Sequence, residues 1–101
     1  MAYVYIPFLE YWAGKMLGDV KTCTSRVRQY GKVGDYFKLF GATFEMTKIE
    51  KVRLDAVANK YHAQEGCDTP EKFMQIWANI HPKKGFVAEQ EVFVHHFKKI
   101  A

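Results

Sequence analysis

The chain has 101 residues, and its 15 Lys and Arg against 11 Asp and Glu give a formal net charge of +4. Hydrophobic and charged contents of 49% and 26% exclude a disordered chain, and the length fits one domain with one core. The positive charge favours anionic partners without selecting one class of them. We therefore expect a single domain over residues 1–101.

The N-terminal third predicts a strand, a short helix and a second strand. Aromatic and β-branched residues indicate a strand at Tyr3–Phe8, and apolar residues at helical spacing indicate a helix at 9–17. Residues 22–28 are expected to be extended, with successive side chains on opposite faces of a strand. Alternation would give this strand one exposed face that is polar and basic, made by Thr22, Thr24, Arg26 and Arg28.

The middle of the chain predicts a hairpin. Two strands at 36–40 and 43–54 would be joined tightly at Gly41-Ala42. The apolar phase shifts along the second of these strands, from Phe44 and Met46 to Ile49, which predicts a bulge near Lys48.

The last part predicts two helices and a strand. A helix at 54–65 would end before Gly66, and a second would begin at Thr69-Pro70, where Thr can cap and Pro suits the first helical position. That helix would end at His81-Pro82, and a strand would follow at 91–97. The element order predicts an α+β fold with a small curled sheet and leaves open whether a barrel closes.

The stretch from Lys21 to Arg26 is the most informative one for chemistry. It brings an amine, three hydroxyls, a thiol and a guanidinium together just after a helix. Clustered hydroxyls and cations suit the binding of a phosphate or a carbonyl group. The alternative is an ordinary exposed polar strand.

Glu65 continues the apolar stripe of its helix, because it lies four residues after Tyr61. An inward carboxylate needs a cation or a polar cleft, since an unpaired buried charge is costly. The alternative is that the helix frays and Glu65 points to water.

Other residues suggest contacts with nucleic acid rather than a metal. Tyr30 lies in a basic turn where it could stack on a base, with Arg28 and Lys32 near enough in sequence to contact phosphates. Trp12 and Trp77 fall on helix stripes and favour the core. The adjacent His95 and His96 would point to opposite faces of a strand and act structurally.

The two cysteines, Cys23 and Cys67, have no CxxC spacing, so we expect reduced thiols, no metal site and no cofactor. The start of the chain lacks a basic region and meets Pro7 and Glu10 early, which does not fit a signal peptide. No stretch approaches the ~20 apolar residues of a membrane span. We therefore expect a cytoplasmic domain without membrane contact.

Lys21 to Arg26 resembles the ASCH domain, whose signature runs Gly-x-Lys-x-x-x-x-Arg between a helix and a strand. The resemblance extends over nearly the whole chain. Further similar segments are Gly31 to Asp35, Ala63 to Gly66, Thr69 to Phe73, Trp77 to Pro82 and Phe86 to Phe97. The chain departs from the signature at Asp19, which stands where the family has Gly.

The resemblance implies a small PUA-like mixed β-barrel with flanking helices and a cleft beside the basic motif, generally assigned to RNA binding. Some small bacterial members deacetylate N(4)-acetylcytidine, and their Lys, Thr and Glu match Lys21, Thr24 and Glu65. At least one member is described as a ribonuclease.

Three hypotheses follow for the function. The first is binding of RNA, a nucleoside or a nucleotide by Arg26, Arg28, Tyr30 and Lys32, beside a cleft formed with Lys21, Thr24 and Glu65. The second is a nucleoside amidohydrolase, with Thr24 as nucleophile, Lys21 as base and Glu65 as proton donor or orienting group. The third is a protein-interaction module that uses Tyr3, Tyr5 or the last strand. The oligomeric state is open.

Overall fold

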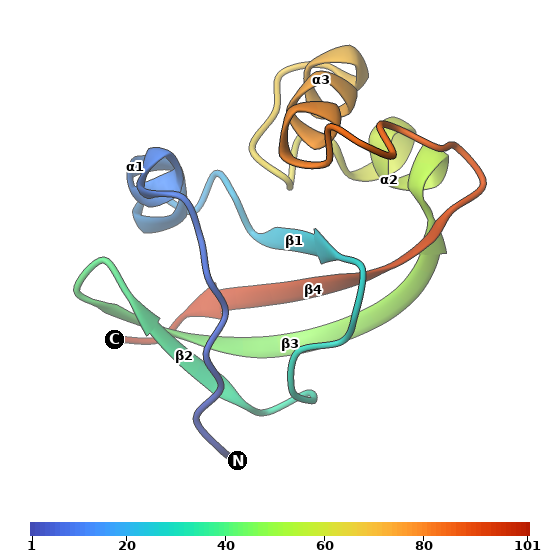
Figure 1. Cartoon of the computed structure of the whole chain (residues 1–101). Helices are drawn as coiled ribbons and strands as arrows, with labels where there is room; N and C mark the ends of the chain where they lie inside the picture. Colours follow the sequence, from blue (N-terminus) through green and yellow to red (C-terminus); the bar gives the residue numbers. More distant parts are fainter.

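Four antiparallel strands form one curled sheet in the computed structural model, which describes residues 1–101. Their order across the sheet is β1-β4-β3-β2. The bounds are Cys23–Arg26 for β1, Tyr36–Leu39 for β2, Ala42–Arg53 for β3 and Glu91–Lys99 for β4. The sheet closes only part of a barrel, and Figure 1 shows the long strands β3 and β4 curving side by side. The predicted α+β class and the curled sheet are thus confirmed, with a half-barrel in place of a closed barrel.

Three α-helices lie on one side of this sheet. A 3₁₀ turn, Glu10–Trp12, runs into α1, Ala13–Leu17, and the two further helices are α2, Leu54–Tyr61, and α3, Pro70–Ile80. In Figure 1, α1 lies near one end of β1, while α2 and α3 lie near the other end. No helix has the length and apolar character that crossing a lipid bilayer requires.

The β2–β3 hairpin turns one residue earlier than the sequence predicts. Leu39 pairs with Ala42, so the two-residue loop is Phe40-Gly41, and both loop residues have positive φ, 55° and 76°. This is the pattern of the tight turns that match the twist of paired strands. The bulge near Lys48 is confirmed, because the β3–β4 register shifts between Met46 and Lys48.

The predicted strand at Tyr3–Phe8 is wrong. Only Tyr3 forms a bridge, with Tyr36, and hydrogen bonds from Val4 N to Tyr36 O and from Tyr36 N to Ala2 O, of 2.8 and 2.9 Å, flank it. Pro7 has no N–H to continue a ladder. The segment has strand propensity without a partner strand, and Tyr3 and Tyr5 are exposed on it.

The hydrophobic core joins the sheet to the helices. Phe37, Phe44 and Phe97 pack together with ring centroids 5.3–5.6 Å apart. The helices add a second group of buried side chains to the same core, namely Met16, Leu54, Val57, Ala58, Phe73 and Trp77.

The helix that precedes Glu65 is shorter than predicted. It ends at Tyr61, and a series of turns over residues 62–66 follows. Glu65 N still donates to Tyr61 O at 2.9 Å, so the chain makes one more helical contact before Gly66. The start of α3 agrees with the prediction, because Thr69 Oγ1 accepts from Lys72 N at 3.1 Å and Pro70 is the first helical residue.

Candidate functional site

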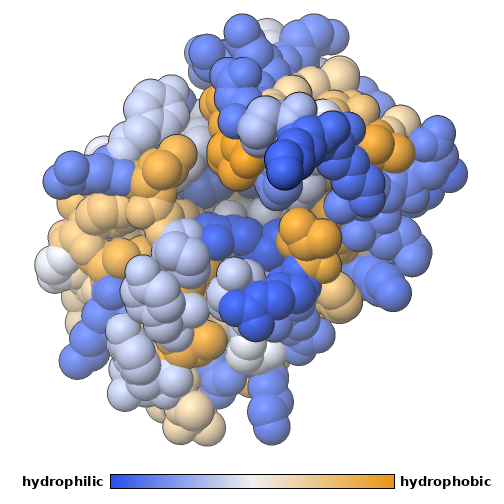
Figure 2. All heavy atoms as spheres, in the orientation of Figure 1, coloured by the Kyte–Doolittle hydropathy of each residue, from blue (hydrophilic) through white to orange (hydrophobic).

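A cleft of about 700 Å³ opens beside β1. Its volume lies within the roughly 300–1,000 Å³ of typical small-molecule sites. The residues that line it come from the segment before α1, from β1, from α3 and from the turn at Glu65. In the space-filling view, hydrophilic residues over β1 lie in the middle of this face, between apolar patches (Figure 2). The cleft therefore combines apolar walls with a polar floor.

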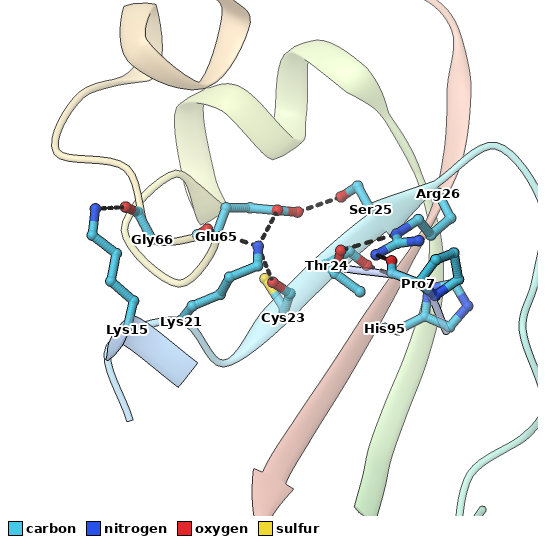
Figure 3. A network of polar contacts seen from close by, with 10 residues as sticks. All are labelled: Pro7, Lys15, Lys21, Cys23, Thr24, Ser25, Arg26, Glu65, Gly66 and His95. Carbon is cyan, nitrogen blue, oxygen red and sulfur yellow. Dashed lines mark hydrogen bonds and ion pairs between the residues drawn. The ribbon is translucent and has the colours of Figure 1, made fainter. Parts of the chain in front are cut away.

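A buried ion pair between Lys21 and Glu65 forms part of that floor. Lys21 Nζ lies 3.1 Å from Glu65 Oε1, and the side chains are 3% and 6% exposed. Lys21 Nζ also donates to Cys23 O at 2.9 Å and to Glu65 O at 2.8 Å (Figure 3). These acceptors match the three N–H bonds of an ammonium group. Glu65 therefore points inward, as its place on the apolar stripe predicts.

Ser25 completes the polar floor, and sequence reasoning did not single it out. Its Oγ donates to Glu65 Oε2 at 2.5 Å, so each carboxylate oxygen of Glu65 has its own donor. In Figure 3, Ser25 extends from β1 toward Glu65. The two residues lie 40 positions apart in the chain, and no local pattern signals such a contact.

Thr24 and Arg26 lie on the other side of β1, toward Pro7 (Figure 3). Arg26 Nε donates to Thr24 Oγ1 at 3.1 Å, and Arg26 Nη2 donates to Pro7 O at 2.7 Å. The guanidinium lies 4.7 Å from the centroid of Phe8. Thr24 is only 5% exposed, so the expectation of an exposed polar face is wrong at this residue. The face is polar because it borders the cleft.

Lys21 and Thr24 both line the cleft, but they have different partners. The three hydrogen bonds of Lys21 Nζ go to Cys23 and Glu65, while the hydroxyl of Thr24 accepts from Arg26. No hydrogen bond joins the two side chains. This separation agrees with strand alternation, because residues three positions apart in an extended segment, such as Lys21 and Thr24, project to opposite faces.

Tyr30 and Arg28 form the basic, aromatic side of the cleft. Both line it, and the Arg28 guanidinium lies over the Tyr30 ring, 4.4 Å from the centroid. Lys32 does not line the cleft. It is exposed on the turn before β2, where its N–H donates to Asp35 Oδ2 at 2.9 Å.

Trp12 and Trp77 combine two roles. They are 7% and 5% exposed and belong to the core, as their helix stripes predict, and they also line the cleft. Trp77 stacks on His81 with centroids 4.2 Å apart. The Nε1–H of Trp77 is buried without a hydrogen-bond partner. These aromatic side chains give the cleft flat apolar walls.

Two left-handed residues bring Lys21 and Glu65 together. Asp19, at the position where the ASCH signature has Gly, has φ of 60° and lets Lys21 N donate back to Lys15 O at 2.9 Å. A short polar residue tolerates this conformation better than most others. Gly66 has φ of 93°, and its carbonyl accepts from Lys15 Nζ at 2.6 Å.

Gly66→Ala is expected to destabilise the fold by at least about 1–2 kcal/mol, the cost of a left-handed L-residue. A Cβ at this position would also lie 2.9 Å from Trp12 Cζ3 and 3.3 Å from Lys21 Cβ. Denaturant unfolding measures the loss. Gly34→Ala is the matched control, because Gly34 has a similar φ of 94° and open space around it. Equal losses in the two variants would contradict the close packing of Gly66 on Trp12.

His95 is a buried structural histidine behind the cleft. Its Nε2 accepts from Tyr30 N at 2.9 Å, so Nδ1 carries the proton and donates to Thr24 O at 3.3 Å. Burial lowers the pKa of His95, and the charge of Arg26 adds to that effect. His96 lies on the opposite face of β4, where its Nε2 is 2.7 Å from Glu50 Oε2. The prediction that the two histidines face opposite ways is confirmed.

The lowered pKa of His95 predicts that stability falls with acid. The unfolded chain binds the proton first, at about pH 6.5, so the free energy of unfolding decreases below that pH until the folded-state pKa is passed. The slope from this one group is at most about 1.4 kcal/mol per pH unit. Denaturant unfolding between pH 8 and pH 5 measures it, with His95→Gln as the non-titrating variant. A slope that persists in His95→Gln would contradict the assignment.

The thiols are poor candidates for chemistry. Both are free and buried, and burial raises the pKa of Cys23 and of Cys67, which disfavours the thiolate. The structure contains no group of three or more His, Cys, Asp or Glu side chains that could hold a metal ion.

Comparison with known proteins identifies the fold. No family model matches the chain, and no curated protein matches it in sequence. Several solved structures are similar to it, and three of them are the following. An ASCH domain from Lactobacillus crispatus has 17% identity and a TM-score of 0.67, over 97% of this chain and 78% of that chain. The hypothetical protein PH0355 has 12% identity and a TM-score of 0.75, over 99% and 100%. Protein EF3133 from Enterococcus faecalis, of family model DUF984, has 16% identity and a TM-score of 0.65, over 98% and 78%.

The chain is therefore a small α+β domain. Its fold is similar to that of the ASCH domain along almost its whole length. At these identities the likeness concerns the fold, and any function has to be argued from the cleft itself.

Proposed function

We propose that the cleft binds an unpaired nucleotide, either within RNA or as a free nucleoside or nucleotide. The observation that carries the proposal is the composition of the cleft. Aromatic side chains form its walls, and its charged groups are three cations and one carboxylate: Lys21, Arg26, Arg28 and Glu65. Proteins that read single-stranded RNA combine such aromatic surfaces with cations that contact phosphates.

In this proposal, each side of the cleft contacts a different part of the ligand. Tyr30, Trp12 and Trp77 offer rings on which a base can stack. Glu65 and Ser25 lie on the polar floor, where they can meet the hydrogen-bonding edge of a base. Arg28 and Arg26 lie on the side that would face the phosphates. A base and its phosphate would thus meet complementary surfaces within one cleft.

Binding by such contacts is expected to weaken with salt, because each neutralised phosphate releases counterions. Fluorescence of Trp12 and Trp77, the only two tryptophans, can follow titrations with single-stranded RNA oligomers at several salt concentrations. Arg28→Ala should weaken binding and reduce the slope of log affinity against log salt by roughly 0.7–1. Arg53→Ala is the matched control, since Arg53 is an exposed arginine outside the cleft that pairs with Asp55.

Salt-independent binding, or equal losses in Arg28→Ala and Arg53→Ala, would contradict the assignment of the cleft. Cytidine and its monophosphate serve as the short probes in the same assay. Equal affinity for cytidine and for its monophosphate would show that the arginines do not contact the phosphate.

A second candidate function is hydrolysis of an acylated amine on a nucleoside in the same cleft. One specific observation favours it: Lys21 and Glu65, two residues matched by the ASCH resemblance, form a buried ion pair on the floor of the cleft. Release of cytidine and acetate from N(4)-acetylcytidine measures this activity, with Glu65→Gln as the variant that should lose it. If the wild-type chain releases no cytidine, hydrolysis is excluded and nucleotide binding is the only proposed function that remains.

A further inference from the structure

We propose that Ser25 is the nucleophile of an acyl-transfer reaction in this cleft, with Glu65 as its general base and Lys21 as the group that orients Glu65. The inference rests on the second candidate function, hydrolysis of an acylated nucleoside. It differs from the expectation from the ASCH resemblance, which gives the role of nucleophile to Thr24.

The two hydroxyls of β1 that line the cleft differ in where their protons go. Ser25 Oγ donates to Glu65 Oε2 at 2.5 Å, so its proton already points at a carboxylate that can accept it. Thr24 Oγ1 accepts from Arg26 Nε at 3.1 Å, and its own proton has no acceptor in the structure. A hydroxyl is a weak nucleophile unless an adjacent base takes its proton. By this criterion Ser25 is activated and Thr24 is not.

The base has the third partner that such arrangements require. Lys21 Nζ donates to Glu65 Oε1 at 3.1 Å and to Glu65 O at 2.8 Å, which holds the carboxylate from the side opposite to Ser25. Nucleophile, base and orienting group thus form one chain of hydrogen bonds. Figure 3 shows this chain running from Lys21 through Glu65 to Ser25.

Ser25 is also favoured by its access to the cleft and by weak competition from other nucleophilic side chains there. It is 8% exposed and lines the cleft. It is also the only serine in the sequence. The one thiol that lines the cleft, Cys67, is buried and has a raised pKa.

The reaction proceeds in two balanced steps. Ser25 Oγ attacks the acyl carbonyl carbon while its proton passes to Glu65 Oε2. The C–N bond then breaks, and Glu65 returns this proton to the departing amine of the nucleoside. Water next attacks the acyl-serine ester and gives one proton to Glu65. Release of the carboxylic acid breaks the ester bond, and Glu65 returns the proton to Ser25 Oγ.

The test is to locate the acyl group on the protein. The chain is incubated with N(4)-acetylcytidine and, separately, with p-nitrophenyl acetate as an activated acetyl donor, then digested and mapped by mass spectrometry. Hydroxylamine removes a serine ester and leaves acetylated lysine intact. An acetyl ester is expected on Ser25 in the wild type and in Thr24→Val. Ser25→Ala should lose the ester and at least about a thousandfold in turnover.

The proposal would be overturned if the acetyl ester formed on Thr24, or if Thr24→Val lost the ester while Ser25→Ala kept it. It would also be overturned if neither donor acetylated the wild type. Circular dichroism confirms that each variant folds. Tryptophan fluorescence of the same samples measures cytidine binding. This measurement distinguishes failure of the proposed nucleophile from failure of the proposed binding function. A chain that binds cytidine and forms no acetyl-serine contradicts only the nucleophile. A chain that does not bind cytidine or its monophosphate contradicts the proposed function as well.

Discussion

Lys21→Met is expected to lower the free energy of unfolding by about 3–5 kcal/mol, the cost of leaving a buried charge without its partner. Both members of the pair are almost fully buried, and Lys21 Nζ also satisfies two carbonyl oxygens, Cys23 O and Glu65 O. The substitution removes all three interactions. For a domain whose total stability is about 5–15 kcal/mol, a loss of this size is a large fraction of the whole. Urea unfolding followed by circular dichroism measures it.

The double variant Lys21→Met/Glu65→Leu is expected to recover most of this loss, because replacing both charges leaves no unpaired one. The matched control is Lys51→Met. Lys51 lies 3.7 Å from Glu91, and the two side chains are 58% and 59% exposed, so this loss should stay under about 1 kcal/mol. The losses in Lys21→Met and Glu65→Leu are also measured separately. If the free energy lost in the double variant equals their sum, the pair does not act as one unit.

Tyr30→Ala is expected to weaken binding of single-stranded RNA by about 1–3 kcal/mol, the value of one base stacked on an aromatic side chain. This corresponds to a loss in affinity of roughly 5- to 150-fold. The Tyr30 ring lines the cleft, and the Arg28 guanidinium lies over it. In the proposed complex this guanidinium contacts the phosphate of the nucleotide whose base stacks on Tyr30. The backbone N–H of Tyr30 that donates to His95 remains in the variant, so the turn keeps this contact.

Tyr5→Ala is the control for that measurement, because Tyr5 is an exposed tyrosine outside the cleft. It should leave the affinity unchanged. Similar losses in Tyr5→Ala and Tyr30→Ala would indicate that RNA binds over the aromatic N-terminal segment instead.

Much of the secondary structure follows from local patterns in the sequence. The cap at Thr69, the end of α3 at His81 and the bulge near Lys48 are each encoded within a few residues. The strand expected at Tyr3–Phe8 shows the limit of such patterns. Its residues favour a strand, but only one residue finds a partner, and strand formation depends on pairing as well as propensity.

The site shows the same division between local and distant information. The inward direction of Glu65 is readable from the apolar stripe of its helix, although the helix itself ends at Tyr61. The contact of Ser25 with Glu65 depends on a turn 40 residues further along the chain, so no local pattern signals it. Lys32 lies close to Tyr30 in sequence, but the turn before β2 carries it away from the cleft.

The most direct test of the proposed function is an NMR titration of the N–H groups with single-stranded RNA and with cytidine monophosphate. Both indole N–H groups report on the cleft, because Trp12 and Trp77 line it. The account predicts saturable shifts of these indole signals and of the backbone signals of β1 and Tyr30, with little change in the β2–β3 hairpin. Unchanged indole signals, or shifts confined to the hairpin or to the N-terminal segment, would contradict the assignment of the cleft as a nucleotide site.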